Sequence, residues 1–247
     1  MPQHPADPDN RPSPPPFPGP AGIADAFRFI SHGGIPVGAW AVYLPLVGGV
    51  LGALWVAVDG LVGALVGRVG ASVALVLVMA AVTRARPLRA LARVLVALPG
   101  RREERLARLD PGTGRPLAVA LVGAAEIALL CALDRFRLVG VAFAPVLGCC
   151  AMVVLAVGSR AARQDGRRLK FAPAVGFREF GAASAATFAL VFLSTEFLGL
   201  LLVLTTAACT IGARVFLHRW IDGVNETAVL ATGEAVQLLV IAVLVVL

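Results

Sequence analysis

The apolar run IPVGAWAVYLPLVGGVLGALWVAV, residues 35–58, sets the fold class of this chain. It contains no charged residue, and a helix of this length is long enough to cross the roughly 30 Å of hydrocarbon in a bilayer. A second apolar run, residues 60–82, is interrupted only by Arg68. The two runs predict a membrane-spanning helical hairpin that turns near Asp59.

The composition of the whole chain agrees with this interpretation. Of the 247 residues, 58% are apolar and only 15% are charged, and the mean hydropathy is +0.85. A soluble domain carries about 25% charged residues. The chain is therefore expected to be an integral membrane protein.

Five more apolar segments follow the hairpin, and they predict an all-α fold, a polytopic membrane helix bundle of about seven spans, with six to eight as the range. The segments are 116–133, 138–158, 181–195, 197–216 and 228–247. Residues 1–22 are rich in proline and predict a disordered tail. Residues 23–247 then form a single membrane domain, with polar segments at 84–115, 159–180 and 217–227.

The positive charge indicates how this domain is oriented. The net charge of +7 comes almost wholly from arginines, most of them in two of the polar segments. The positive-inside rule places such segments in the cytoplasm, so we expect a protein of the plasma (inner) membrane whose three polar segments face the cytoplasm. Seven spans then put the N-terminus inside and the C-terminus outside. The same distribution argues against nucleic acid as a partner.

The arginine-rich stretch RPLRALARVLVAL, residues 86–98, predicts an amphipathic helix. Two functions are compatible with its pattern: a helix lying among lipid headgroups, or a helix that binds a phosphorylated substrate through arginine. Periodicity does not separate them. The two faces consist of Leu88, Leu91, Leu95 and Leu98 on one side and of Arg86, Arg89 and Arg93 on the other.

Acidic residues inside the apolar runs suggest a further possibility. Glu126 and Glu234 lie deep in their runs, where an ionisable side chain is costly and a functional role is the default hypothesis. Each is interpreted either as a buried polar contact or as the lining of a cavity. Glu196 is expected at a membrane interface. The four cysteines lie in apolar runs without metal or disulfide spacing and are interpreted as small buried apolar residues.

Five short segments, taken in chain order, resemble the cobalamin synthase family, the membrane-embedded adenosylcobinamide-GDP ribazoletransferases. In the third of them Cys149 replaces the family's arginine, and in the last Glu226 replaces its aspartate. The resemblance covers residues 27–247. The segments are FRFISHGGIP at 27–36, LPLVGGVLGA at 44–53, APVLGCCAM at 144–152, ARQDG at 162–166 and DGVNET at 222–227.

The resemblance breaks in the arginine-rich stretch. The family carries L-D-G-L-A-D-T-x-D-G there, and this chain has LRALARVLVA at 88–97. Three acids are thus replaced by Arg89, Arg93 and Val96. The RREER helix that follows in the family is kept at 101–105, and Asp110 matches the acid of the next turn.

The resemblance implies a phosphotransferase of the last steps of cobalamin biosynthesis. It would join adenosylcobinamide-GDP and α-ribazole, or the 5′-phosphate of α-ribazole, giving adenosylcobalamin or its phosphate and GMP. Such a transfer depends on Mg²⁺ held by carboxylates, so Mg²⁺ is the expected cofactor of an active enzyme. Asp110 and Glu226 are the expected catalytic residues, and both are expected metal ligands together with Glu103. The residues expected to bind the substrate phosphates are Arg89, Arg93, Arg101, Arg102 and Arg163.

Two alternatives remain open at this point. Loss of the acids favours a catalytically silent family member that acts as a membrane scaffold or as a corrinoid-binding regulator, with other cobalamin-assembly enzymes as further partners. A small transporter is the third hypothesis, and it depends on Glu126 and Glu234.

Overall fold

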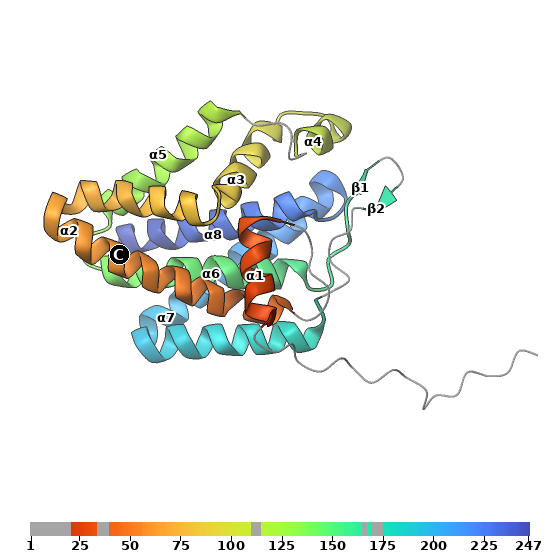
Figure 1. The fold of residues 1–247 in the computed structure, drawn as a ribbon. Coiled ribbons are helices and arrows are strands. Elements are labelled where there is room, and N and C mark those ends of the chain that lie inside the picture. The colour runs from red at the N-terminus through yellow and green to blue at the C-terminus, as the bar shows by residue number, and fades with distance from the viewer. Residues whose placement is uncertain (1–20, 34–39, 110–114, 165–166, 169–174) are drawn as a thin grey trace, which may run out of the picture.

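The structure is a computed structural model that describes residues 21–33, 40–109, 115–164, 167–168 and 175–247 (Figure 1). Four of its helices are long and apolar enough to cross a membrane, and α5 (Pro116–Ala132) is a shorter apolar helix. The prediction of an all-α membrane helix bundle is confirmed. The four long helices are α2 (Leu44–Val82), α6 (Arg137–Ala156), α7 (Phe177–Ile221) and α8 (Glu226–Val246).

Two of these helices are hairpins. With 39 and 45 residues, α2 and α7 would each extend about twice the thickness of a bilayer at roughly 1.5 Å per residue. The helical geometry is interrupted in α2 at Gly67 (φ 78°) and in α7 at Glu196 (φ 51°). Counting each half separately and adding α5 gives seven apolar segments in the described ranges, the number predicted from the sequence. Glu196 lies between the apolar segments 181–195 and 197–216 that the sequence predicts as separate spans.

The turn in α2 lies at Gly67, so the prediction of a turn near Asp59 is wrong. Asp59 is helical and its carboxylate accepts hydrogen bonds from Arg137 at 2.6 to 3.1 Å. Arg137 also donates to Ser72 at 3.2 Å, so the two halves of α2 lie side by side. Gly67 adopts a left-handed φ that a glycine tolerates at no steric cost. A partner from a distant helix therefore keeps Asp59 inside the span.

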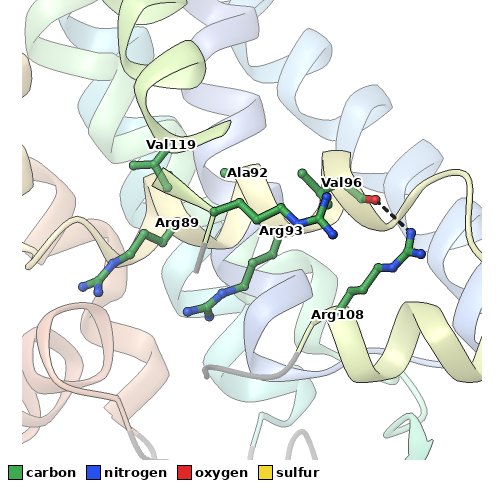
Figure 2. Close-up of a pocket in the computed structure, with 7 residues that line it drawn as sticks. Arg89, Ala92, Arg93, Val96, Arg108 and Val119 are labelled. Carbon is green, nitrogen blue, oxygen red and sulfur yellow. Dashed lines mark hydrogen bonds between the residues drawn. The ribbon is translucent and has the colours of Figure 1, made fainter. Parts of the chain in front are cut away.

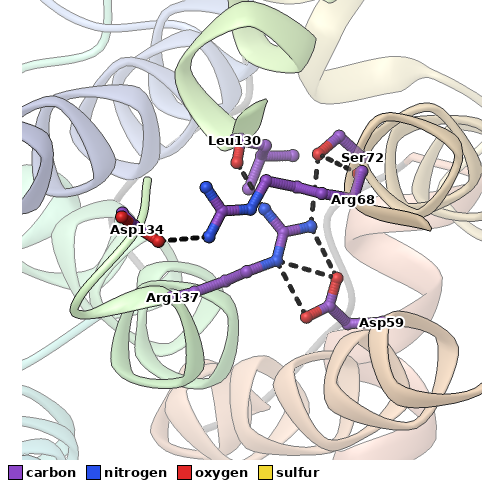
Figure 3. A network of polar contacts seen from close by, with 6 residues as sticks. All are labelled: Asp59, Arg68, Ser72, Leu130, Asp134 and Arg137. Atoms are coloured by element: carbon purple, nitrogen blue, oxygen red, sulfur yellow. Dashed lines mark hydrogen bonds and ion pairs between the residues drawn. The ribbon is translucent and has the colours of Figure 1, made fainter. Parts of the chain in front are cut away.

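Figure 3 shows the polar network that closes this end of the bundle. Arg137 also donates to the Leu130 carbonyl of α5, and Arg68 forms an ion pair with Asp134 in the loop between α5 and α6. The hydrogen bond and the positive charge of Arg68 lower the pKa of Asp134. The side chains of Arg137 and Asp59 are only 13% and 20% exposed. The network holds the α2 hairpin against α5 and α6.

Replacing Arg137 with methionine is expected to destabilise the fold by about 3 kcal/mol, because it leaves the carboxylate of Asp59 largely buried without its cation. Thermal unfolding of the purified protein in detergent measures the effect. The matched control is Arg135→Met, two residues earlier in the loop. The guanidinium of Arg135 lies over the Phe136 ring. Equal unfolding temperatures for the two variants would contradict this assignment, whereas the further change Asp59→Asn should restore part of the loss.

The centre of the bundle is α6, whose side chains are mostly buried against α2, α7 and α8. Two close helix crossings depend on glycine. A Cβ atom at Gly52 of α2 would lie 2.1 Å from the Ala142 carbonyl oxygen, and one at Gly148 of α6 would lie 2.7 Å from the Gly233 carbonyl oxygen. Small residues let helix backbones approach in this way within membranes. The segments 44–53 and 144–152, which carry part of the family resemblance, therefore act in helix packing.

The remaining elements gather at the end of the bundle opposite the Arg137 network (Figure 1). The C-terminus of the chain lies at the other end. Which end faces the cytoplasm stays a prediction. These elements are α1 (Ala21–Ser31), the 3-10 helix η1 (Trp40–Tyr43), α3 (Arg86–Ala97), α4 (Arg102–Arg108) and the short strands β1 (Arg163–Gln164) and β2 (Arg167–Arg168).

The N-terminal helix differs from the sequence prediction. The tail was predicted to extend over residues 1–22, but α1 already begins at Ala21, and residues 1–20 lie outside the described residues. Phe29 and Ile30 of α1 are almost completely buried. The FRFIS segment is therefore part of the folded domain.

Candidate functional site

A pocket of about 190 Å³ lies where α3, α4 and the start of α5 meet (Figure 2). Liquid water occupies about 30 Å³ per molecule, so the pocket has room for roughly six waters or for a phosphate-sized group. Among the described residues, four arginines and three small apolar side chains line it. The lining residues are Arg89, Ala92, Arg93, Val96, Arg108, Arg115 and Val119.

The packing of α3 explains why two arginines face this pocket. Leu88 and Leu91 are 5% and 9% exposed, because α3 packs against α8 and α5. Arg89 and Arg93 are spaced i, i+4 and so share the face that remains. Figure 2 shows their side chains projecting in the same direction.

This packing corrects the lipid-surface interpretation of the leucine face. Only Leu95 and Leu98 are exposed, at 48% and 42%. Leu88 and Leu91, which the periodicity places on the same lipid-facing stripe, contact protein instead. The helix is one of the packed helices of the bundle, with only its C-terminal turn presenting leucine outward.

The other two arginines reach the pocket from separate elements. After the turn at Pro99 and Gly100, α4 runs back so that Arg108 donates to the Val96 carbonyl at 3.4 Å. Arg108 also forms an ion pair with Glu104 at 3.4 Å, the i, i+4 pair that the sequence pattern indicates. Arg115 precedes the first turn of α5. Sequence reasoning missed both residues as site candidates, since their approach to Arg89 and Arg93 depends on the turn and on helix packing.

The charge of the pocket is strongly one-sided. Four of its described lining residues are arginines, and no described lining residue carries a carboxylate. Guanidinium groups donate in a planar fork that matches phosphate oxygens and form charge-assisted hydrogen bonds with them. The arrangement is suited to an anion with several oxygens, of which a phosphate or diphosphate is the common biological example.

A second cluster lies near the start of α3, where segments distant in the sequence meet. Arg86 forms an ion pair with Glu226 at the first residue of α8 and also donates to the Phe29 carbonyl at the end of α1. A Cβ atom at Gly33 would lie 2.5 Å from the Arg86 guanidinium and 2.9 Å from Glu226. Arg86 thus joins the two segments, through its hydrogen bond to Phe29 of FRFISHG and its ion pair with Glu226 of DGVNET.

Replacing Arg86 with alanine is expected to cost about 2 kcal/mol of stability, because Glu226 and two carbonyls of α1 lose a charge-assisted donor. Protease cleavage within residues 21–33, followed together with thermal unfolding, would report the release of α1. Arg101→Ala is the control, since it removes an exposed arginine at the same end of the bundle. If Arg86→Ala resists protease as well as the control does, the ion pair does not fix α1.

The DGVNET segment is held in place by further contacts. Gly223 (φ 144°) packs so closely against residues 160–162 that a Cβ atom would lie 2.5 Å from the Arg160 carbonyl oxygen. The Asn225 side chain accepts a hydrogen bond from the Ala228 amide and caps α8. Thr227 donates to the Leu109 carbonyl at 3.0 Å. This last bond fixes the end of α4 beside the start of α8.

The other predicted site residues are spread over the polar end. Arg102 forms an ion pair with Asp222 at 3.2 Å, and Arg101 and Glu103 are exposed on α4. The backbone of Arg163 pairs with Arg168 in the β1–β2 hairpin. Arg101, Arg102 and Glu103 are not among the described lining residues of the pocket. Asp110, predicted as a catalytic residue and metal ligand, lies outside the described residues.

The two intramembrane acids are buried, and Glu126 takes part in a polar contact. Glu126 of α5 and Glu234 of α8 are 1% and 5% exposed, and Gln237 donates to Glu126 at 3.0 Å. Neither acid lines the arginine pocket. All four cysteines are free. Of the two interpretations of Glu126, the contact with Gln237 favours a buried polar contact.

Comparison with known sequences connects this geometry to a family. The sequence model of the cobalamin-5-phosphate synthase family matches residues 23–246, nearly the whole chain. The chain belongs to the cobalamin-5-phosphate synthase family. Membership assigns it to cobalamin synthesis by a cobalamin-synthase-type enzyme. No curated protein and no solved structure matches the chain.

The pocket lies where the sequence of this chain departs from the family's pattern. By the resemblance, Arg89, Arg93 and Val96 stand where the family's L-D-G-L-A-D-T-x-D-G pattern has its acids, and all three line the pocket. The place where the resemblance breaks is therefore a single surface in space. The resemblance thus implies a change of this surface from acidic to basic.

Proposed function

We propose that this cobalamin-synthase-type protein uses the arginine pocket to hold the diphosphate of adenosylcobinamide-GDP. The observation that carries the proposal is that four arginines, from α3, α4 and the start of α5, line one pocket. The positions in the pocket that replace the family's acids support the same assignment. The pocket lies at the polar end of the bundle, which the charge distribution predicts to be cytoplasmic.

The proposed reaction joins the corrinoid to α-ribazole or to its 5′-phosphate. A ribose hydroxyl attacks the phosphorus that is attached to cobinamide, a new P–O bond forms, and the P–O bond to GMP breaks. GMP leaves with the bridging oxygen, and the hydroxyl proton passes to a base. Arginines around the diphosphate would orient it for in-line attack and stabilise the negative charge that develops on the leaving phosphate.

The carboxylates predicted for catalysis stay part of the proposal. Glu226 is the described candidate for the base, although its side chain is paired with Arg86. Asp110 follows Leu109, whose carbonyl is bound by Thr227 next to Glu226. Changing Glu226 to glutamine or Asp110 to asparagine would then lower the turnover rate more than it lowers substrate binding.

The expected Mg²⁺ does not fit the described donors of the pocket. Mg²⁺ takes near-octahedral oxygen ligands, usually with one or two carboxylates, and the lining supplies guanidinium groups instead. The described residues contain no group of three or more His, Cys, Asp or Glu side chains that could hold a metal ion. No step of the proposed reaction is therefore assigned to a metal.

Reconstitution tests the proposed reaction. The full-length protein in lipid nanodiscs would be incubated with adenosylcobinamide-GDP and α-ribazole, and the products separated by chromatography. We expect equal amounts of a cobalamin product and GMP. Adenosylcobinamide-GDP bound tightly but left unchanged would contradict turnover and support the second candidate function.

That second candidate is a catalytically silent corrinoid-binding regulator. The ion pairs of the polar end favour it, because Glu226, Asp222 and Glu104 are each already engaged with an arginine. A carboxylate that is held by an arginine is less available to bind a metal ion or a substrate proton than one that faces the pocket alone. Binding without product formation distinguishes this function from the transferase.

A further inference from the structure

His218, near the end of α7, joins that helix to the connector, residues 158–162, which follows α6. The Nδ1 atom of His218 lies 2.8 Å from the Arg214 carbonyl oxygen, one turn earlier in α7. The Nε2 atom lies 3.3 Å from the backbone nitrogen of Arg160 in the connector. Both ring nitrogens therefore have a hydrogen-bond partner on the backbone.

These two partners determine the protonation state of the ring. A carbonyl oxygen only accepts hydrogen bonds, so Nδ1 of His218 must carry a hydrogen and donate it. A backbone N–H only donates, so Nε2 must be unprotonated and accept. The neutral imidazole with its hydrogen on Nδ1 is the one form that makes both contacts. A protonated ring would present an N–H to the N–H of Arg160 and lose that hydrogen bond.

The elements that meet near His218 carry mainly positive charge, so a second proton on the ring would add to it. Among the described residues, no ion pair includes His218, and the two carboxylates on these elements are each paired with an arginine. The charged residues are Arg214 and Arg219 of α7, Arg160 of the connector, Arg105 of α4, Asp222 with its partner Arg102, and Glu226 of α8 with its partner Arg86.

The connector is held from its other side by the DGVNET segment. The Val224 amide donates to the Arg160 carbonyl at 2.8 Å, and the Ala162 amide donates to the Val224 carbonyl at 3.0 Å. Strand β1 begins with Arg163, directly after the connector. The connector thus links the ARQDG and DGVNET segments, and His218 fixes it to the end of α7.

We propose that His218 is a pH-sensitive switch for this connection. The neutral ring accepts the Arg160 amide and holds the connector against α7. The protonated ring releases that amide, while the connector keeps its bonds to Val224 and to the Arg214 guanidinium. Histidine side chains commonly change charge between about pH 5 and 8, so the contact stabilises the connector at the upper end of this range and is lost toward the lower end. The switch belongs to the protein without substrate and does not depend on the proposed reaction.

Hydrogen–deuterium exchange followed by mass spectrometry tests the switch at the Arg160 amide. The full-length protein in lipid nanodiscs would be labelled at about pH 8 and at about pH 5, with labelling times scaled for the pH dependence of intrinsic exchange. We expect the protection of this amide to fall roughly fivefold at the lower pH, which corresponds to the loss of one hydrogen bond. Equal protection of the Arg160 amide at both pH values would overturn the proposal.

Two variants of His218 separate this contact from a general effect of acid. His218→Ala removes the acceptor, so the Arg160 amide should exchange at both pH values as it does in the unchanged protein at the lower pH. His218→Gln has a side-chain oxygen that accepts a hydrogen bond but does not titrate, so protection should no longer depend on pH. Unfolding temperatures at the higher pH establish that both variants fold.

The matched control is His32→Ala, which removes an exposed imidazole directly after α1. The ring of His32 contacts the Ser31 hydroxyl, so this variant should keep the full pH response at the Arg160 amide. A pH response that survives in both His218 variants, or that disappears in His32→Ala, would assign the switch to another group and overturn the proposal.

Discussion

Replacing Arg89 and Arg93 together with alanine is expected to weaken the binding of adenosylcobinamide-GDP by roughly 100-fold or more. Each arginine supplies a charge-assisted contact of about 1.5–3 kcal/mol, and about 1.4 kcal/mol corresponds to a factor of ten. Calorimetry or spectroscopic titration of the corrinoid with the protein in nanodiscs measures the loss. Arg89 is exposed and Arg93 is half-buried on the face of α3 that lines the pocket.

The control for this double variant is Arg135→Ala with Arg219→Ala, for which we expect nearly unchanged affinity. Unfolding temperatures of all three proteins establish that the comparison concerns binding and not folding. An affinity of the Arg89 and Arg93 variant within about twofold of the unchanged protein, a difference of only about 0.4 kcal/mol, would mean that the pocket does not hold the diphosphate.

The second large effect is a loss of stability, expected when Gly52 is replaced. Changing it to alanine puts a Cβ atom 2.1 Å from the Ala142 carbonyl oxygen of α6, a distance that only a backbone shift can relieve. Overpacking of this kind costs about 3 kcal/mol, which corresponds to an unfolding temperature lower by roughly 6–12 °C for a chain of this size. Thermal unfolding in a single detergent would measure it.

Gly60→Ala in the same helix provides the matched control. A Cβ atom at Gly60 meets nothing within 4 Å, and alanine favours the helical state over glycine by about 1 kcal/mol. Gly60→Ala should therefore leave the unfolding temperature unchanged or raise it slightly. Equal unfolding temperatures for Gly52→Ala and Gly60→Ala would contradict a close crossing of α2 and α6 at Gly52.

The membrane-spanning segments could be predicted because hydrophobic length is a local property. The runs that form α5, α6 and α8 and the halves of α7 follow directly from it. The turn of α2 could not be predicted this way. Asp59 breaks the apolar run more visibly than Gly67 does, and only the distant Arg137 makes a helical Asp59 acceptable.

In the candidate site, too, some residues could be predicted from the sequence and others are placed by the packing of distant elements. Arg89 and Arg93 could be paired from the sequence because they lie one helical turn apart. Arg108 and Arg115 could not, since their place depends on how α4 and α5 pack against α3. The contact of Arg86 with Glu226, across 140 residues, likewise has no local signal. The resemblance did indicate that positions 89, 93 and 96 belong together.

The most direct test of the central claim is to locate the substrate. A cryo-electron microscopy map of the full-length protein in nanodiscs with adenosylcobinamide-GDP would show where the diphosphate lies. We predict phosphate density within hydrogen-bonding distance of Arg89 and Arg93, with Arg108 and Arg115 completing the site. Density for the diphosphate beside Glu226 and Arg86, with the arginine pocket empty, would contradict the account.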